Sequence, residues 1–309
     1  MQAASMTVVQ RQNFRHLYLD ILWWGILAGS TIALVSVYLV RLGASTFQLA
    51  LLAAGPALIN LFFSIPAGHW LKNRDLRITT FWTSILFRGG YLLLIFLPNL
   101  LPSQSSQLWT VILVYLIAAI PGTILAISFN ALFAELVEPA WRPYVVGRRN
   151  AILALSITVT SLVVSYLLEE ISFPLNYQVV FAIGFIGAAL SSWNLFKFKP
   201  ADGPHPNGTS AIHDRAGMVM QRDGDVVRRP AGLRFLARLD TTRWLRLDLV
   251  RGPFGYFLAA YLFFYIAQYL PTPLFPVYLV DELGISESVI SIGGALFYLG
   301  VMVVSLALN

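Results

Sequence analysis

Residues 17–40 read LYLDILWWGILAGSTIALVSVYLV, an apolar run whose one charged side chain is Asp20. A helix needs about 20 predominantly apolar residues to cross a bilayer, so this run predicts a membrane-spanning helix. It is longer than the apolar core of a secretory signal peptide, it contains Trp23 and Trp24, and another apolar run follows it at once. We therefore interpret it as the first span of a polytopic membrane protein.

The composition of the whole chain supports this interpretation. Hydrophobic residues make up 57% of the 309 residues and charged residues 12%, whereas soluble domains carry about 25% charged residues. This balance excludes an ordinary soluble enzyme, a disordered protein and a fibrous repeat. Cysteine is absent, no two of the four histidines have metal-ligand spacing with a third ligand, and no phosphate loop or nucleophile elbow occurs. We expect neither catalysis nor a metal or cofactor.

Eight apolar runs along the chain are long enough to cross a bilayer, and they predict an all-α membrane protein. They are Leu17–Val40, Phe47–Trp70, Ile78–Leu97, Leu108–Ala134, Val145–Leu168, Pro174–Phe196, Phe254–Val280 and Val289–Leu308. Three prolines, Pro271, Pro273 and Pro276, should kink the seventh span.

The connections between these runs carry a strongly asymmetric charge. The side of the N-terminal tail holds Arg11, Arg15, Lys72, Arg74, Arg77, Arg142, Arg148, Arg149 and eleven Lys or Arg residues between Lys197 and Arg251. The opposite side holds Arg41 with Glu169, Glu170, Asp281, Glu282 and Glu287. Because cytoplasmic loops are enriched in Lys and Arg, we expect a cytoplasmic N-terminus in a plasma (inner) membrane. This arrangement explains the basic charge without a nucleic acid partner.

A long basic connection divides the chain into three parts: residues 1–198 with six spans, residues 199–252, and residues 253–309 with two spans. Residues 200–210 are rich in turn-forming residues, whereas Leu233 to Val250 mix Leu, Phe and Trp with spaced Arg. The second pattern predicts a helix at the membrane surface. The connection is either a linker held against the inner leaflet or a binding site for a partner.

A short internal repeat relates the first and seventh spans. Val37-Tyr38-Leu39-Val40-Arg41-Leu42-Gly43 matches Val277-Tyr278-Leu279-Val280-Asp281-Glu282-Leu283-Gly284 with one inserted residue. A new apolar run follows each copy. Both copies would begin in the same orientation, which indicates a parallel repeat about an axis along the membrane normal.

Six spans, a basic loop and a second set that starts in the same orientation resemble the major facilitator superfamily. The family's loop signature, Gly-x-x-x-Asp-Arg-x-Gly-Arg-Arg/Lys, is matched at Gly68 and at the basic Arg77. Its Asp, Arg and second Gly positions hold Lys72, Asn73 and Asp75. The segments 135–142 (ELVEPAWR) and 147–150 (GRRN), with Arg142 and Arg149, are similar to the family's related acidic–Pro–Arg segment.

The resemblance implies a bundle of two six-helix halves, of which this chain holds the first half and two helices of the second. A parallel second half of the same length would end near residue ~440, so we interpret the chain as a C-terminally truncated member of the family. A natural eight-span protein is the alternative.

Charged groups inside the membrane are costly and therefore restrict the packing of the spans. Arg88 lies near the middle of the third span, Asp20 begins the first and Glu135 ends the fourth. We expect Arg88 to pair with one of these carboxylates. Such a pair either locks the first six helices together or belongs to a solute pathway.

Polar groups near mid-depth identify candidate solute contacts. In the seventh span Tyr261, Tyr265, Gln268 and Thr272 share one helix face, and Thr31 and Asn60 lie at mid-depth in spans one and two. Transporter sites of this type lie at the midplane between repeats. Aromatic rings with one amide suit an apolar or amphipathic solute. The alternative is a polar seam between packed helices.

Two functions remain open at this stage. The first is a secondary active or facilitated transporter of a small solute, working by alternating access between two helical halves. The second is a non-transporting membrane sensor or assembly protein with the same fold. The absence of a mid-depth carboxylate from the eight spans argues against proton coupling within them. The oligomeric state stays open.

Overall fold

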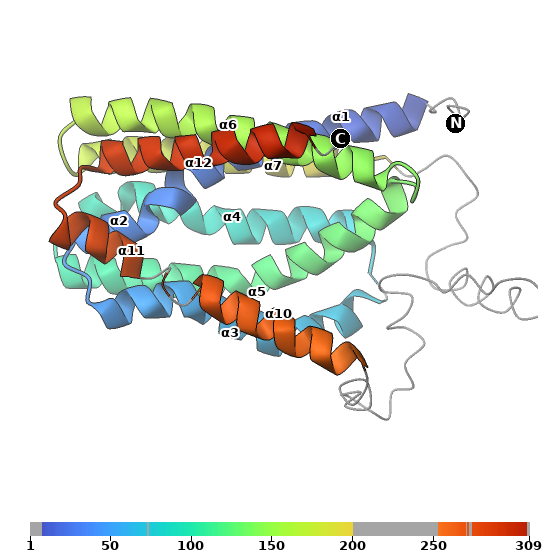
Figure 1. Cartoon of the computed structure of the whole chain (residues 1–309), viewed down its shortest axis with the longest axis horizontal. Helices are drawn as coiled ribbons and strands as arrows, with labels where there is room; N and C mark the ends of the chain where they lie inside the picture. Colours follow the sequence, from blue (N-terminus) through green and yellow to red (C-terminus); the bar gives the residue numbers. More distant parts are fainter. Residues whose placement is uncertain (1–7, 73, 200–252, 270, 272–273, 308–309) are drawn as a thin grey trace, which may run out of the picture.

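The computed structural model of the chain describes residues 8–72, 74–199, 253–269, 271 and 274–307, which form helices joined by short connections (Figure 1). Among these residues are six helices long and apolar enough to cross a membrane, in agreement with the first six predicted spans. They are α1 (Val8–Leu27) continued by a π-helical turn η1 (Ala28–Ile32) and α2 (Ala33–Arg41), then α3 (Thr46–Leu71), α4 (Leu76–Leu100), α5 (Gln104–Leu136), α6 (Arg142–Glu170) and α7 (Leu175–Phe196).

Several helices begin or end outside the predicted apolar runs. An apolar run shows which part of a helix lies in the membrane, whereas hydrogen-bonded caps determine where the helix begins and ends. At the start of α3, the side chains of Ser45 and Gln48 bond reciprocally to each other's backbone N–H groups, which forms a capping box. At the start of α4, the Asp75 carboxylate accepts hydrogen bonds from the N–H groups of Arg77 and Ile78. These caps fix two helix starts that hydropathy alone misses by one or two residues.

The seventh predicted span is disturbed at its prolines, as expected, and the disturbance is larger than a kink in one helix. Helix α10 (Pro253–Tyr269) ends before the proline-rich stretch, and α11 (Leu274–Val277) with a second π-helical turn η3 (Tyr278–Glu282) follows it. At 1.5 Å per residue, the 17 described residues of α10 rise about 25 Å, which is less than the roughly 30 Å apolar core of a bilayer. The physical cause of the break is proline, which cannot continue the backbone hydrogen bonds of a helix. The last helix, α12 (Glu287–Ala307), begins two residues before the predicted run.

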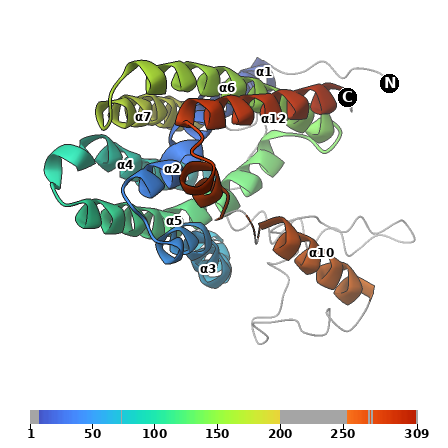
Figure 2. The same ribbon diagram turned by 60° about the vertical axis from the view of Figure 1, so that its left-hand side comes forward.

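The helices α1 to α7 form a six-helix bundle (residues 8–199). Helix α1 packs against α6 and α7, α4 packs against α5 and α7, and α3 packs against α5. Helix α12 lies along α6, and α11 touches α2. Helix α10 stands clear of the bundle when the molecule is turned (Figure 2), and most of its side chains are exposed.

The internal repeat is visible in the backbone at the ends of α2 and η3. Gly43 and Gly284 both have positive φ, +83° and +59°. The N–H of Ala44 bonds to the carbonyl of Leu39 at 2.9 Å, as the N–H of Ile285 bonds to that of Leu279 at 2.9 Å. A π-helical turn holds one residue more than an α-helical turn, so η3 absorbs the one inserted residue without changing the geometry of the helix end.

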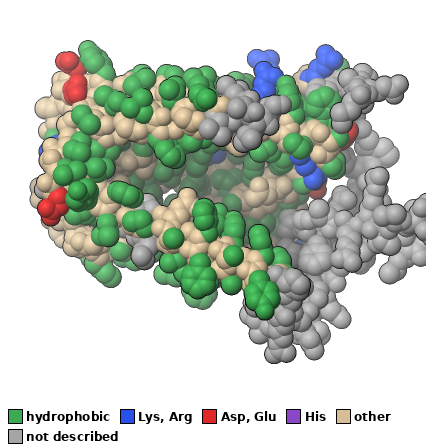
Figure 3. All heavy atoms as spheres, viewed as in Figure 1, with side chains coloured by type: hydrophobic (Ala, Val, Ile, Leu, Met, Phe, Trp, Pro, Cys, Tyr) green, Lys and Arg blue, Asp and Glu red, His purple; other side chains and the backbone are tan. Residues whose placement is uncertain are grey.

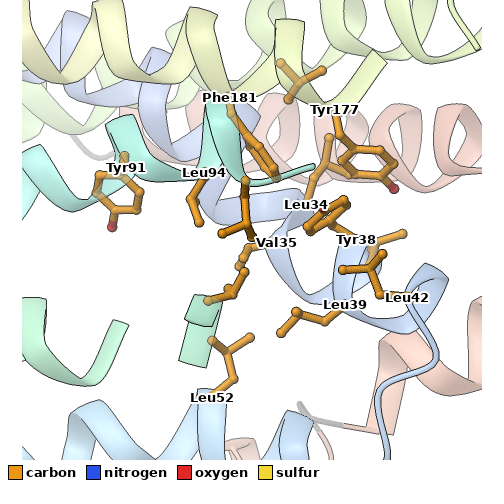
Figure 4. Packing of buried hydrophobic residues seen from close by; sticks show 14 of the residues in the cluster. Leu34, Val35, Tyr38, Leu39, Leu42, Leu52, Tyr91, Leu94, Tyr177 and Phe181 are labelled. Atoms are coloured by element: carbon orange, nitrogen blue, oxygen red, sulfur yellow. The ribbon is translucent and has the colours of Figure 1, made fainter. Parts of the chain in front are cut away.

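A cluster of aromatic side chains joins α2, α7 and the start of α5. The Tyr38 ring lies 4.9 Å from Tyr177 and 5.3 Å, edge-on, from Phe181, between ring centroids, and Figure 4 shows these rings packed with Leu34 and Leu94. The Tyr38 hydroxyl donates to Gln107 Oε1 at 3.1 Å. This contact satisfies a polar group that would be costly to bury alone.

Lys and Arg side chains gather at one end of the bundle, which we call the basic end, and acidic side chains predominate at the other, which we call the acidic end (Figure 3). The basic end carries Arg74, Arg77, Arg142, Arg148 and Lys197, and the acidic end carries Glu169, Glu170, Glu282 and Glu287 with Arg41. The predicted surface helix at Leu233 to Val250 lies outside the described residues.

Candidate functional site

A buried ion cluster joins three helices of the bundle. Asp20 of α1 lies between Arg88 of α4 and Arg149 of α6: its two carboxylate oxygens are 3.8 Å from Arg88 Nη2 and 3.3 Å from Arg149 Nη2. All three side chains are nearly buried, with exposed fractions of 5%, 7% and 11% for Asp20, Arg88 and Arg149. Asp20 is the carboxylate that the structure brings to Arg88. The second arginine was not predicted as its partner.

Further contacts bring α5 and α7 into this cluster. Ser191 donates to Asp20 Oδ1 at 2.6 Å, and Arg88 Nη1 donates to Ser192 Oγ at 2.9 Å. The Arg88 guanidinium lies 5.1 Å from the centroid of the Trp24 ring, and that of Arg149 lies 4.7 Å from Phe129. Rings that face a guanidinium stabilise its charge where water is excluded. The cluster therefore ties five helices of the bundle together, which fits a structural role.

Two candidate solute contacts in the bundle, Thr31 and Asn60, differ in exposure: Thr31 is buried and Asn60 is exposed. Thr31 is fully buried in the π-helical turn η1, with its hydroxyl against Gly184 of α7. This position fits close helix packing, which the small Gly184 permits. Asn60 of α3 is exposed, and its side-chain oxygen accepts a hydrogen bond from Thr123 of α5.

The candidates of the seventh span lie on α10. Tyr261 donates to the Tyr265 hydroxyl at 2.9 Å, and their ring centroids are 4.5 Å apart. Phe257 stacks on Tyr261 at 5.8 Å, which extends the aromatic face towards the start of the helix. Gln268 is exposed one turn further on, and Thr272 lies outside the described residues.

A row of hydroxyl groups connects α6 with α12, and we call it the α6–α12 seam. Ser165 donates to the carbonyl of Ser288 at 3.0 Å, Ser291 to that of Ser161 at 2.8 Å, and Thr158 to that of Ala295 at 3.3 Å. On each helix these residues are spaced i, i+3 and i+7, so they form one straight contact face. This seam was not predicted, although the matching spacing of small and hydroxyl residues in both helices was a signal for it.

An ion pair at the acidic end also connects the bundle with α12. Arg41, which ends α2, bonds through both Nε and Nη2 to the carboxylate of Glu287, with Nη2 to Oε2 at 2.8 Å. Tyr177 of α7 approaches the same carboxylate at 3.5 Å. A bidentate pair of this kind fixes geometry as well as charge.

The family model of the Major Facilitator Superfamily matches residues 22–309. The chain belongs to this superfamily. It is therefore a multi-pass membrane protein of a transporter family, with the all-α fold predicted from its spans. A comparison with curated proteins finds no match.

The loop residues that resemble the superfamily signature lie at the basic end. Gly68 lies near the end of α3, and Lys72 and Arg74 are exposed beyond it. Arg142 has a structural contact that the sequence did not predict: it donates to the carbonyls of Val137 at 3.0 Å and Ala134 at 2.8 Å. These bonds fix the turn between α5 and α6.

One small pocket in the bundle lies between α4 and α5. Its volume of about 10 Å³ is close to the minimum for a single water molecule, so it is too small for a solute. The lining residues are Phe87, Gly90, Tyr91, Val114, Tyr115 and Ala118. In the part of the chain that the structure describes, no group of three His, Asp or Glu side chains is placed to hold a metal ion.

Proposed function

We propose that the chain is a secondary transporter of a small solute that works by alternating access between two helical halves. The first half is residues 1–198, residues 199–252 connect the halves, and residues 253–309 begin the second. We further propose a plasma-membrane location with the N-terminus and the basic end in the cytoplasm, because positive charge marks the cytoplasmic side of membrane proteins. Family membership favours transport over a non-transporting sensor or assembly protein.

The observation that carries this proposal is the uneven contact between the bundle and the C-terminal helices. At the acidic end, Arg41 binds Glu287, and α11 and η3 touch α2. At the basic end, α10 stands away from the bundle (Figure 2). Contact at the acidic end, together with a separated α10, supports one state of an alternating transporter, and we propose that this state faces the basic end.

The α6–α12 seam supports a pivot between the halves. Its bonds run from hydroxyl groups to backbone carbonyls, and it involves no ion pair among the described residues. Small residues allow helices to approach closely, and in membranes such hydrogen bonds contribute only about 0.6 kcal/mol each on average. A contact of this strength holds two helices together and still permits them to rotate.

The candidate solute contacts are Asn60 on α3 and the face of Tyr261, Tyr265 and Gln268 on α10. All four are exposed, and their rings and amides suit an apolar or amphipathic solute.

The experiment measures distances between spin labels at both ends of the molecule. Because the chain has no cysteine, labels can be attached at engineered pairs: Gln104 with Leu283 at the acidic end, and Tyr144 with Tyr256 at the basic end. Glu287→Gln removes the ion pair. We expect the acidic-end distance to increase and the basic-end distance to decrease in this variant. Unchanged distances at both ends, in a variant that folds normally, would contradict alternating access controlled by this contact.

A further inference from the structure

Helices α4 and α7 pack along each other and carry a distinctive set of side chains at the basic end. Phe81 of α4 and Phe196 of α7 join the two helices, with ring centroids 5.0 Å apart. Trp82 contacts Phe81, Trp193 contacts Phe196, and two cations, Arg77 of α4 and Lys197 after α7, lie at the same end of these helices. We call this surface the α4–α7 site. Helices α4 and α7 lie on the side of the bundle away from α10 (Figure 2).

Of the two cations of this site, Lys197 is exposed and Arg77 is partly exposed. The Lys197 Nζ lies 4.6 Å from the centroid of the Trp193 ring. Arg77 lies one helical turn before Phe81 on the same face of α4. Among the residues that the structure describes, neither cation forms an ion pair with a carboxylate. The nearby Asp75 uses its carboxylate to cap α4.

The aromatic side chains next to these cations are exposed although they are strongly apolar. The exposed fractions of Trp82, Trp193 and Phe196 are 57%, 55% and 53%. Towards mid-depth, the exposed side chains of Ile85 and Ile186 continue the surface. From the end of the helices inward, the surface therefore changes from cationic to aromatic to aliphatic.

This order matches the headgroup, interface and acyl-chain regions of a phospholipid. Tryptophan favours the level of the headgroups, and Lys or Arg near the membrane surface attracts anionic lipids. We propose that the α4–α7 site binds an anionic phospholipid, with its phosphate between Arg77 and Lys197 and an acyl chain that begins beside Trp82 and Trp193 and continues along Ile85 and Ile186. The two positive charges favour a net negative headgroup over the zwitterionic phosphatidylcholine. This inference does not depend on the proposed transport function.

The test compares binding of phosphatidylglycerol and phosphatidylcholine with identical acyl chains to the purified full chain, by native mass spectrometry. Each cation at an anionic membrane surface contributes about fivefold to binding. The double variant Arg77→Gln/Lys197→Gln should therefore bind phosphatidylglycerol about 25-fold less, with phosphatidylcholine unchanged. The control Lys72→Gln/Arg74→Gln removes the same charge from another part of the basic end and should retain binding.

A second measurement places the lipid by quenching of tryptophan fluorescence. Phosphatidylglycerol with brominated acyl chains should quench the wild type more strongly than brominated phosphatidylcholine. Trp193→Phe should remove most of this difference, whereas Trp70→Phe should preserve it. Equal binding of the two lipids by the wild type would overturn the proposal. Equal losses in the two double variants would also overturn it, because total charge and not this site would then attract the lipid.

Discussion

Replacement of Asp20 by Asn tests whether the buried ion cluster holds the bundle together. Asn keeps the shape of the side chain and an acceptor for Ser191, but it leaves Arg88 and Arg149 buried without a negative partner. Removing one partner of a buried ion pair costs about 3–5 kcal/mol. Since 1.36 kcal/mol is a factor of ten, we expect the unfolding equilibrium constant to rise by roughly two to four orders of magnitude.

Reversible unfolding in mixed detergent micelles, followed by tryptophan fluorescence, measures this change. Asp75→Asn is the matched control, because Asp75 is exposed at the start of α4 and Asn caps a helix about as well as Asp. Adding Arg149→Gln to Asp20→Asn should recover part of the lost stability by removing one unpaired charge. If Asp20→Asn unfolded at the same detergent fraction as Asp75→Asn, the cluster would have no structural role and the reasoning would fail.

Two further predictions concern packing inside the bundle. Gly184→Ala should lower the free energy of unfolding by about 1–3 kcal/mol, because the new methyl carbon would lie 2.0 Å from Thr31 Oγ1. In the same unfolding assay, adding Thr31→Ala should recover the lost stability. The control Gly68→Ala should lose none, because its new methyl carbon meets no atom within 4 Å. Tyr38→Phe removes the hydroxyl that donates to the buried Gln107 and should cost about 1–3 kcal/mol; a loss below 0.3 kcal/mol would show that Gln107 finds another donor.

The spans and the sorting of charge were predictable because each depends on local composition. A bilayer requires a long apolar run wherever the chain crosses it, so hydropathy locates α3 or α7 from one segment alone. The prolines likewise predicted a disturbance of the seventh span. They did not predict that two separate helices, α10 and α11, would be found there, because the effect of a proline depends on which neighbours satisfy the backbone groups that it leaves free.

Contacts between distant helices were harder to predict. Arg149 looked like a loop residue at the start of a span, and only the packing of α1 against α6 brings it to Asp20. Thr31 looked like a mid-depth polar contact, but Gly184 of α7 allows such close approach that its hydroxyl is enclosed. The inserted residue in the repeat did not by itself predict a π-helical turn, which is defined by the hydrogen bond from the Leu283 N–H to the Tyr278 carbonyl.

Accessibility of Asn60 from both sides of the membrane tests alternating access most directly. Asn60→Cys in the otherwise cysteine-free chain would be treated with a membrane-impermeant thiol reagent in right-side-out and in inside-out vesicles. The account predicts labelling in both orientations, faster from the side of the basic end, with a shift towards the opposite side in Glu287→Gln. Labelling from one side alone, in both the wild-type background and Glu287→Gln, would contradict it.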